Sequence, residues 1–195
     1  MPEKEQFRPS EEVIKRGNIF ELVHLSQEDG RIFEVARRAP GVRVIIADKI
    51  NEKILLTREF RRELNAWDYR LPGGKVFDSL EEYGTFRGAG GDILVPAKSK
   101  AIDEAAEEAG IVISALHEVK KSTLGATVEW DLYIFEADAW SQSDSGQKLE
   151  TGERIEADAW VSYKEAQAMI MDGKMQEERV ALSLLQWLHI QKEKE

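Results

Sequence analysis

A short acidic helix limits what this chain can fold into more than any other part of the sequence. The run 101–111 reads Ala-Ile-Asp-Glu-Ala-Ala-Glu-Glu-Ala-Gly-Ile. At 100° per residue, Glu104, Glu107 and Glu108 share an arc of about 100° on one side of this helix. The opposite side carries small apolar residues, which let a helix lie close to a sheet: Ile102, Ala105, Ala106 and Ala109. The spacing therefore predicts a helix that packs on a sheet and presents a cluster of carboxylates.

The acidic side of this helix works against the helix itself. Glu104 and Glu108 are like charges four residues apart, and Glu107 and Glu108 lie near the C-terminal end, where the helix dipole disfavours anions. A bound cation would remove both penalties, and clustered carboxylate oxygens suit Mg²⁺ or Mn²⁺. A solvated acidic face is the alternative interpretation. We expect Ser99 to cap the start of the helix and Gly110 to end it in the left-handed conformation.

The acidic helix follows a tight turn, and the two together resemble the motif of a known family. Residues 71–75 read Leu-Pro-Gly-Gly-Lys, and residues 104–111 read Glu-x-x-Glu-Glu-x-Gly-Ile. This order resembles the Nudix box of the Nudix hydrolases. Asp103 stands where the family has an arginine that orients the glutamates, and Leu80 stands where an acidic residue is expected. The segment between turn and helix is also longer than the motif allows, which we interpret as an insertion at about 83–98.

Size and composition are those of a soluble globular protein. A chain of 195 residues with 42% hydrophobic and 33% charged residues can bury one full core, with room for a small appendage. The net charge of −10 argues against binding to nucleic acids or anionic membranes. The absence of cysteine excludes disulfides and thiolate metal sites. No apolar run resembles a signal peptide or a membrane span, so we expect a cytoplasmic location.

The resemblance implies an α+β architecture, the Nudix fold, in which a mixed β-sheet is sandwiched between helices. We expect a Nudix domain over residues 41–195, preceded by a small N-terminal antiparallel β-hairpin region over residues 1–40. Within that region, residues 1–17 are expected to be a loose lead-in, and residues 20–25 and 31–37 to pair as a hairpin. A solitary hairpin is marginal in water. In the ADP-ribose pyrophosphatase-like branch of the family a sheet of this kind helps to form a dimer, so the resemblance implies a homodimer.

The remaining elements follow from hydrophobic periodicity. Alternating or apolar runs predict strands at 42–47, 53–61, 117–121 and 129–137. Helical spacing predicts a helix at 163–171, capped by Ser162, and a final amphipathic helix at 177–190. The insertion holds four glycines and is expected to be a loop. It either closes over phosphates or is an excursion on the surface.

The resemblance also implies an activity, a cofactor and a set of catalytic residues. It implies hydrolysis of the pyrophosphate of ADP-ribose or a related nucleoside diphosphate sugar, with Mg²⁺ (or Mn²⁺) as cofactor and a small-molecule sugar nucleotide as partner. The implied metal ligands are the carbonyl of Gly73 and the carboxylates of Glu104, Glu107, Glu108 and Glu153. The catalytic residues are expected in a late acidic loop, at Glu150 and Glu153, with Glu150 as a substitute because Thr151 occupies the position where the family has its catalytic glutamate. An ordinary solvated acidic turn is the alternative for this loop.

Three arginines and one tryptophan are candidate substrate contacts. A guanidinium binds phosphate through two parallel hydrogen bonds, which makes Arg61, Arg70 and Arg87 candidates for phosphate or sugar. Trp67 is a candidate for stacking on a nucleobase. The alternatives are surface salt bridges for the arginines and core packing for the tryptophan. At the level of function, the alternatives are a Nudix-fold protein that senses nucleotides without turnover, and an unrelated α/β protein with a chance acidic helix.

Overall fold

Strands and helices of this α+β chain belong to two units, and each unit draws on several stretches of sequence. The computed structural model describes residues 10–62, 65–149, 151 and 154–193. The first unit comprises Met1–Pro40, Phe77–Gly91 and Thr123–Asp131. The second comprises Gly41–Val76, Asp92–Ser122 and Leu132–Glu195.

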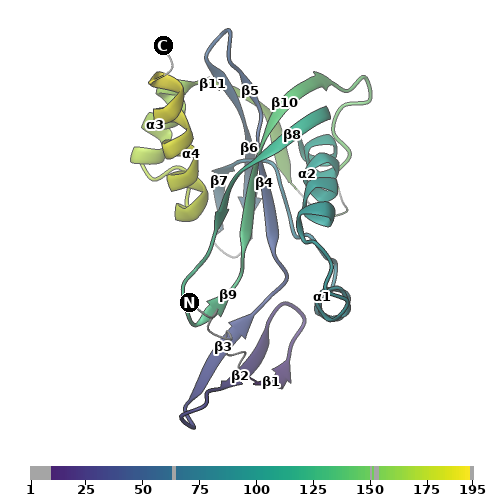
Figure 1. Cartoon of the computed structure of the whole chain (residues 1–195). Helices are drawn as coiled ribbons and strands as arrows, with labels where there is room; N and C mark the ends of the chain where they lie inside the picture. Colours follow the sequence, from purple (N-terminus) through teal and green to yellow (C-terminus); the bar gives the residue numbers. More distant parts are fainter. Residues whose placement is uncertain (1–9, 63–64, 150, 152–153, 194–195) are drawn as a thin grey trace, which may run out of the picture. The chain divides into compact units, whose positions relative to one another are not determined.

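The first unit contains a four-stranded sheet. Its strands lie in the order β1 (Ser10–Arg16), β2 (Glu21–Ser26), β3 (Ile32–Arg37) and β9 (Val128–Glu129) (Figure 1). Strands β2 and β3 pair antiparallel along their whole length, with Gly30 at φ 82° in the turn, so the predicted hairpin is confirmed. The expected loose lead-in is wrong for residues 10–16, because they pair with β2. All of β1 is exposed, so its sequence lacks the buried apolar positions by which a strand is recognised.

A buried arginine joins the separate stretches of the first unit. Arg37 is only 1% exposed. Its Nε donates to Glu129 at 2.8 Å, and its Nη1 donates to Glu11 at 2.9 Å and to Glu21 at 3.5 Å. Because a buried charge is costly unless it is paired, these carboxylates are what permits the guanidinium to be buried.

The insertion is helical, so the predicted loop at 83–98 is wrong. Ser79 caps the start of helix α1 (Leu80–Gly88), and its hydroxyl accepts from the amide of Glu82. The ring of Phe77 packs against Tyr83 at 5.4 Å and Phe86 at 5.0 Å. Glycine content suggested a loop, but the serine cap and these aromatic contacts outweigh the weak helix propensity of glycine.

Two sheets form the centre of the second unit. One has the order β4 (Gly41–Ile45), β10 (Leu132–Gln142) and β8 (Ile111–Ser122). The other has the order β11 (Ile155–Ser162), β6 (Lys53–Arg61) and β5 (Ala47–Asp48), and β7 (Ala66–Arg70) pairs with β6. β10 runs parallel to β4 and antiparallel to β8, so the sheet is mixed.

The predicted strand at 42–47 is divided between the two sheets. Its first part, β4, pairs with β10, and only β5 pairs with the return strand β6. Side chains along this stretch alternate between two hydrophobic cores. Val42, Val44 and Ile46 belong to the core beneath helix α2, whereas Ile45 and Ala47 belong to the core beneath α3 and α4.

Helix α2 (Leu94–Ala109) carries the acidic cluster and starts earlier than predicted. Ser99 is not its cap, because the helix already begins at Leu94, whose amide donates to the Asp92 side chain at 3.0 Å. Pro96 is tolerated because it lies in the first turn, where amides have no partner within the helix. Gly110 ends the helix at φ 64° as predicted. Of the predicted apolar side chains, Ala105 and Ala109 are buried on the sheet together with Ala97 and Ala101, whereas Ile102 and Ala106 are only half-buried.

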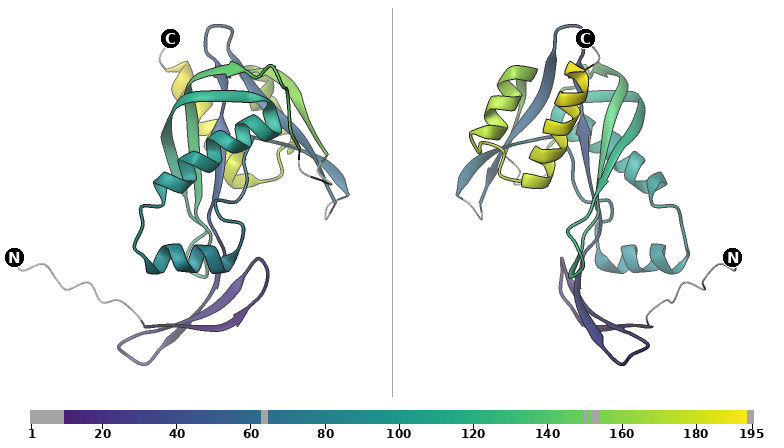
Figure 2. Two further views of the ribbon diagram at one scale, coloured as in Figure 1. Left: turned by 90° about the vertical axis from the view of Figure 1, so that its right-hand side faces the viewer. Right: turned by 60° about the vertical axis from the view of Figure 1, so that its left-hand side comes forward.

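Two helices cover the other face of the strands. Helix α3 (Tyr163–Met171) begins with a capping box formed by Ser162 and Glu165, and helix α4 (Glu178–Lys192) follows. Both predicted helices are confirmed, and Figure 2 shows them side by side. Figure 1 shows α2 on the opposite side of the same strands, so helices flank the sheets of this unit on both sides. No helix in the described residues is long and apolar enough to cross a membrane.

Candidate active site

The turn that precedes the acidic helix lies against the start of β4. The amide of Val42 donates to the carbonyl of Gly74, and the amide of Val44 donates to that of Pro72, each at 2.9 Å. This approach requires glycine. Gly73 has φ 146°, and a Cβ added to it would lie 2.2 Å from the carbonyl oxygen of Val42. A Cβ on Gly74 would lie 2.1 Å from Oε1 of Glu104, so the turn also touches the acidic helix.

Two glutamates of α2, Glu104 and Glu108, lie against this turn. Glu108 accepts a hydrogen bond from the amide of Gly73 at 2.8 Å. Glu104 is 9% exposed and forms an ion pair with Lys100 at 3.0 Å, one turn earlier on the same helix. Glu107 is more exposed, and Lys100 also lies 3.8 Å from it. Lys100 therefore supplies positive charge to two of the glutamates.

Burial and mutual repulsion perturb the acidity of two of these carboxyls. Burial raises the pKa of Glu108 to about 8; the nearby guanidinium of Arg43 opposes this shift, whereas the carboxylate of Glu104 adds to it. Burial also raises the pKa of Glu104, against the effect of Lys100. Strongly perturbed carboxyls that lie together are typical of functional sites.

A buried arginine, Arg43, completes the site from strand β4. Its Nη1 donates to the carbonyl oxygen of Gly73, and to that of Val42 at 3.2 Å. Its Nη2 lies 3.3 Å from Glu177, the residue that precedes α4. Burial and the neighbouring guanidinium of Arg70 lower the pKa of Arg43, but a guanidinium remains charged at neutral pH.

Two of the three candidate arginines join the same network. Arg70 donates to Glu59 at 2.7 Å and to Glu177 at 2.7 Å, and Arg61 donates to the other oxygen of Glu59 at 2.9 Å. Glu177 accepts from both Arg43 and Arg70. Although burial alone would raise the pKa of Glu177, these two guanidiniums hold it below its ordinary value. The network thus links β4, β6, β7 and the start of α4.

The other substrate candidates lie elsewhere. Trp67 is opposite Phe60 in the β6–β7 pair, and successive residues of a strand point to opposite faces. Trp67 therefore lies on the face away from Glu59, where its ring stacks under the guanidinium of Arg58 at 4.5 Å. Arg87 belongs to the first unit, where it donates to Glu11 at 3.1 Å. The assignments of Trp67 and Arg87 as substrate contacts stay predictions.

Part of the predicted site lies outside the described residues. Glu150 and Glu153 are not among them, so their assignments as base and metal ligand stay predictions. Within the described part of the chain, no group of three or more His, Cys, Asp or Glu side chains is gathered as a ready metal site. Arg43 and Glu177 were not predicted. A charged residue inside the apolar run at 42–47 was the signal in the sequence, because a buried charge requires a partner.

The donor chemistry of α2 fits a divalent cation. Glu104 and Glu108 supply hard carboxylate oxygens, and the Cβ-less position of Gly74 leaves room for the Glu104 carboxylate against the turn. The carbonyl of Gly73 accepts a hydrogen bond from Arg43, so an ion at this oxygen would lie beside a guanidinium. The assignments of Gly73, Glu104, Glu107 and Glu108 as metal ligands stay predictions.

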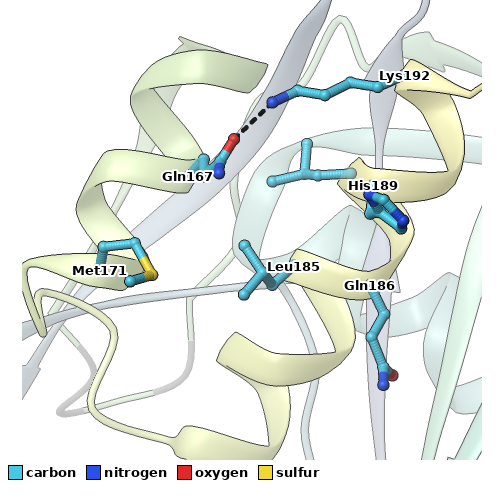
Figure 3. A pocket seen from close by; sticks show the side chains of 7 residues that line it. Gln167, Met171, Leu185, Gln186, His189 and Lys192 are labelled. Atoms are coloured by element: carbon cyan, nitrogen blue, oxygen red, sulfur yellow. Dashed lines mark hydrogen bonds between the residues drawn. The ribbon is translucent and has the colours of Figure 1, made fainter.

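The second unit also has a surface cavity, which is lined by none of the residues of this network. It has a volume of about 350 Å³ and is lined by residues of α3 and α4, including Met171, Leu185 and His189 (Figure 3). Lys192 donates to Gln167 across it at 2.7 Å. None of the candidate site residues lines this cavity.

Comparison with known proteins shows the fold of the chain. A solved structure described as an ADP compounds hydrolase is similar to it with a TM-score of 0.63 and 20% sequence identity, over 96% of this chain and 98% of that one. The chain therefore has the Nudix-like α+β fold that the sequence predicted. No family model and no curated protein sequence matches the chain.

Proposed function

We propose that this chain is a hydrolase that cleaves the pyrophosphate of ADP-ribose or a related nucleoside diphosphate sugar. The products would be a nucleoside monophosphate and a sugar phosphate. The observation that carries the proposal is the contact between Glu108 and the amide of Gly73, with Glu104 against the adjoining Gly74. It joins both halves of the box-like motif in a chain whose structural neighbour is described as an ADP compounds hydrolase.

In this proposal, the glutamates of α2 hold Mg²⁺ or Mn²⁺. A bound divalent ion neutralises phosphate charge and lowers the pKa of a water nucleophile. Glu104 and Glu108 supply the principal oxygens and Glu107 assists, with Lys100 released from Glu104 when the ion binds. Arg61 and Arg70 are proposed to bind phosphate or sugar. Each now pairs with Glu59, so a phosphate would compete with that carboxylate.

A nucleotide sensor without turnover is the second candidate function. It is favoured by two positive charges in the site. Lys100 forms an ion pair with Glu104, and Arg43 donates to the carbonyl of Gly73. In a protein of this kind, the site would bind a nucleotide without activating water.

An assay with a panel of sugar nucleotides tests the proposal. Purified protein is incubated with ADP-ribose and other nucleoside diphosphate sugars, first with Mg²⁺ and then with chelator, and released nucleoside monophosphate is measured. Release that depends on the metal supports the hydrolase. Metal-dependent binding with no release on any substrate would favour the sensor instead.

The homodimer also remains a proposal. Its support is a set of large apolar side chains on strands of the first unit that are between 43% and 59% exposed: Val13, Ile14, Ile32 and Phe33. Exposed apolar side chains gathered on one sheet are typical of contact surfaces. Light scattering on the intact chain would give the mass directly, and a monomer at all concentrations would reject the dimer.

A further inference from the structure

The backbone of Gly73 is held at two points, at its N–H by the Glu108 carboxyl and at its carbonyl oxygen by the Arg43 guanidinium. Its N–H donates to Glu108 at 2.8 Å, and its carbonyl oxygen accepts from Nη1 of Arg43. The same nitrogen of Arg43 also donates to the carbonyl of Val42 at 3.2 Å. A guanidinium thus sits at an oxygen that is next to the carboxylate cluster.

The charge of Arg43 is only partly balanced by its own ion pair. Its nearest carboxylate, Glu177, lies 3.3 Å away and is shared with Arg70, which is closer at 2.7 Å. The side chain of Arg43 is 9% exposed, and its Nε finds no acceptor among the described residues. Solvent therefore screens this charge weakly, and it acts on the neighbouring Glu108, whose acidity it increases.

We propose that Arg43 is a positioning residue that occupies, with its own positive charge, the cation position at the Gly73 carbonyl. A divalent ion that bound this oxygen would lie about 2.0–2.6 Å from it. The ion and the guanidinium would then compete for one oxygen in a site that is largely shielded from water. The metal is consequently held by the carboxylates of α2, and Gly73 is not a ligand. This inference rests on the proposed function, because it assigns a role within the same site.

Metal binding measured without substrate tests the inference. Mn²⁺ is titrated calorimetrically into wild type and Arg43→Met, which keeps the bulk of the side chain and removes its charge. We expect Arg43→Met to bind Mn²⁺ at least about tenfold more tightly, or with an additional ion, because a like charge has left the site. Arg58→Met is the matched control, since Arg58 is on β6, in the other sheet of this unit, and pairs with exposed Glu156. Its affinity for Mn²⁺ should equal that of wild type.

A second variant protects the test against misfolding. Arg43→Lys keeps the charge but cannot span Gly73, Val42 and Glu177 together. It should bind Mn²⁺ no more tightly than wild type, whereas a neutral side chain should bind it more tightly. Melting curves and circular dichroism identify any variant that does not fold. Should Arg43→Met misfold, Arg43→Gln takes its place with the same expectation.

The outcomes separate this inference from the proposed function. Equal affinity and stoichiometry for Mn²⁺ in wild type and Arg43→Met would overturn the inference, as would no binding in either. Turnover of sugar nucleotides is measured on the same samples. Tighter binding in Arg43→Met with no turnover in wild type supports the inference and rejects the hydrolase. Turnover in wild type with unchanged binding in the variant supports the hydrolase and rejects the inference.

Discussion

Glu108 has a structural contact with the turn and, in the proposed hydrolase, a role as a metal ligand. Its carboxylate accepts from the amide of Gly73, yet burial and the neighbouring Glu104 raise its pKa. A carboxylate placed at such a cost is expected where charge is useful to the reaction.

Replacing Glu108 by glutamine should therefore separate activity from stability. In Glu108→Gln the side-chain amide oxygen still accepts from Gly73, but the group can no longer ionise to hold a metal ion. We expect turnover to fall by about 10²–10³-fold while the melting temperature stays within a few degrees of wild type. Asp103→Asn is the control, since Asp103 is exposed, and it should hydrolyse substrate at nearly the normal rate. A Glu108→Gln enzyme with normal turnover would remove Glu108 from the site.

Glu177 should make the protein sensitive to acid. Its pKa is held below the ordinary value of 4.5 in the folded state, so the folded protein favours the ionised form. The stabilisation is present above that value and is lost as the pH falls through the lower folded pKa. Glu177→Gln should lower the unfolding free energy by about 3 kcal/mol at neutral pH, because it leaves Arg43 without its carboxylate.

Denaturant unfolding at pH 7 and at successively lower pH checks this expectation. The difference between wild type and Glu177→Gln should shrink as the pH falls below about 4.5. Glu178→Gln, which changes the exposed neighbouring residue, should follow the wild-type curve. A constant difference at every pH would contradict the role of ionised Glu177.

At the scale of the element, the turn between β7 and α1 meets two different demands with two adjacent glycines. Gly73 is required by the backbone, since its φ is 146° and a Cβ would overlap the Val42 carbonyl. Gly74 is required by a side chain, because its Cβ would overlap the carboxylate of Glu104. Overlap with a backbone atom is harder to relieve than overlap with the end of a side chain.

The two alanine substitutions should consequently have different effects. Gly73→Ala should destabilise the fold by about 3 kcal/mol, since it adds backbone strain and a clash. Gly74→Ala should cost less than about 1 kcal/mol but reduce turnover, because Glu104 must move. Thermal unfolding and the hydrolysis assay distinguish the two. Equal losses of stability in both variants would show that the distinction is wrong.

Much of the fold was predictable from the sequence because it depends on local patterns. The β2–β3 hairpin, β6 and both C-terminal helices follow from periodicity and caps. The errors come from contacts that propensity and periodicity do not show, some near in sequence and some distant. Glycines suggested a loop at 83–98, but α1 is stabilised by packing on Phe77. The resemblance predicted the glutamates of α2, whereas the pairing of Arg43 with Glu177 joins residues 134 positions apart, which no local pattern reveals.

At the scale of the whole molecule, the first unit is assembled from distant stretches around one charged residue. Arg37 on β3 pairs with Glu11 on β1, with Glu21 on β2 and with Glu129 on β9. Strand β3 therefore carries the buried charge, and each of the other three strands of this sheet supplies a carboxylate that pairs with it.

Arg37→Met should loosen this unit selectively. Loss of the guanidinium leaves its carboxylates near one another without their common cation, and we expect a loss of about 3 to 5 kcal/mol in the stability of the sheet. Hydrogen exchange of the β2 and β3 amides should accelerate, while the amides of β10 in the second unit keep their protection. Arg31→Met, at an exposed ion pair with Asp29, is the control and should change neither. Equal acceleration in both units would indicate that they unfold together.

The stretch 42–47, which includes most of β4, passes between two hydrophobic cores and contributes alternate side chains to each. Ile45 is enclosed by residues on the α3 and α4 side, and Ile46 by residues on the α2 side. A shift of this stretch by one residue would exchange the contents of both interiors at once. Two independent packing requirements therefore fix the same few residues. A larger side chain in one core would shift this stretch and so also disturb the packing of the other core.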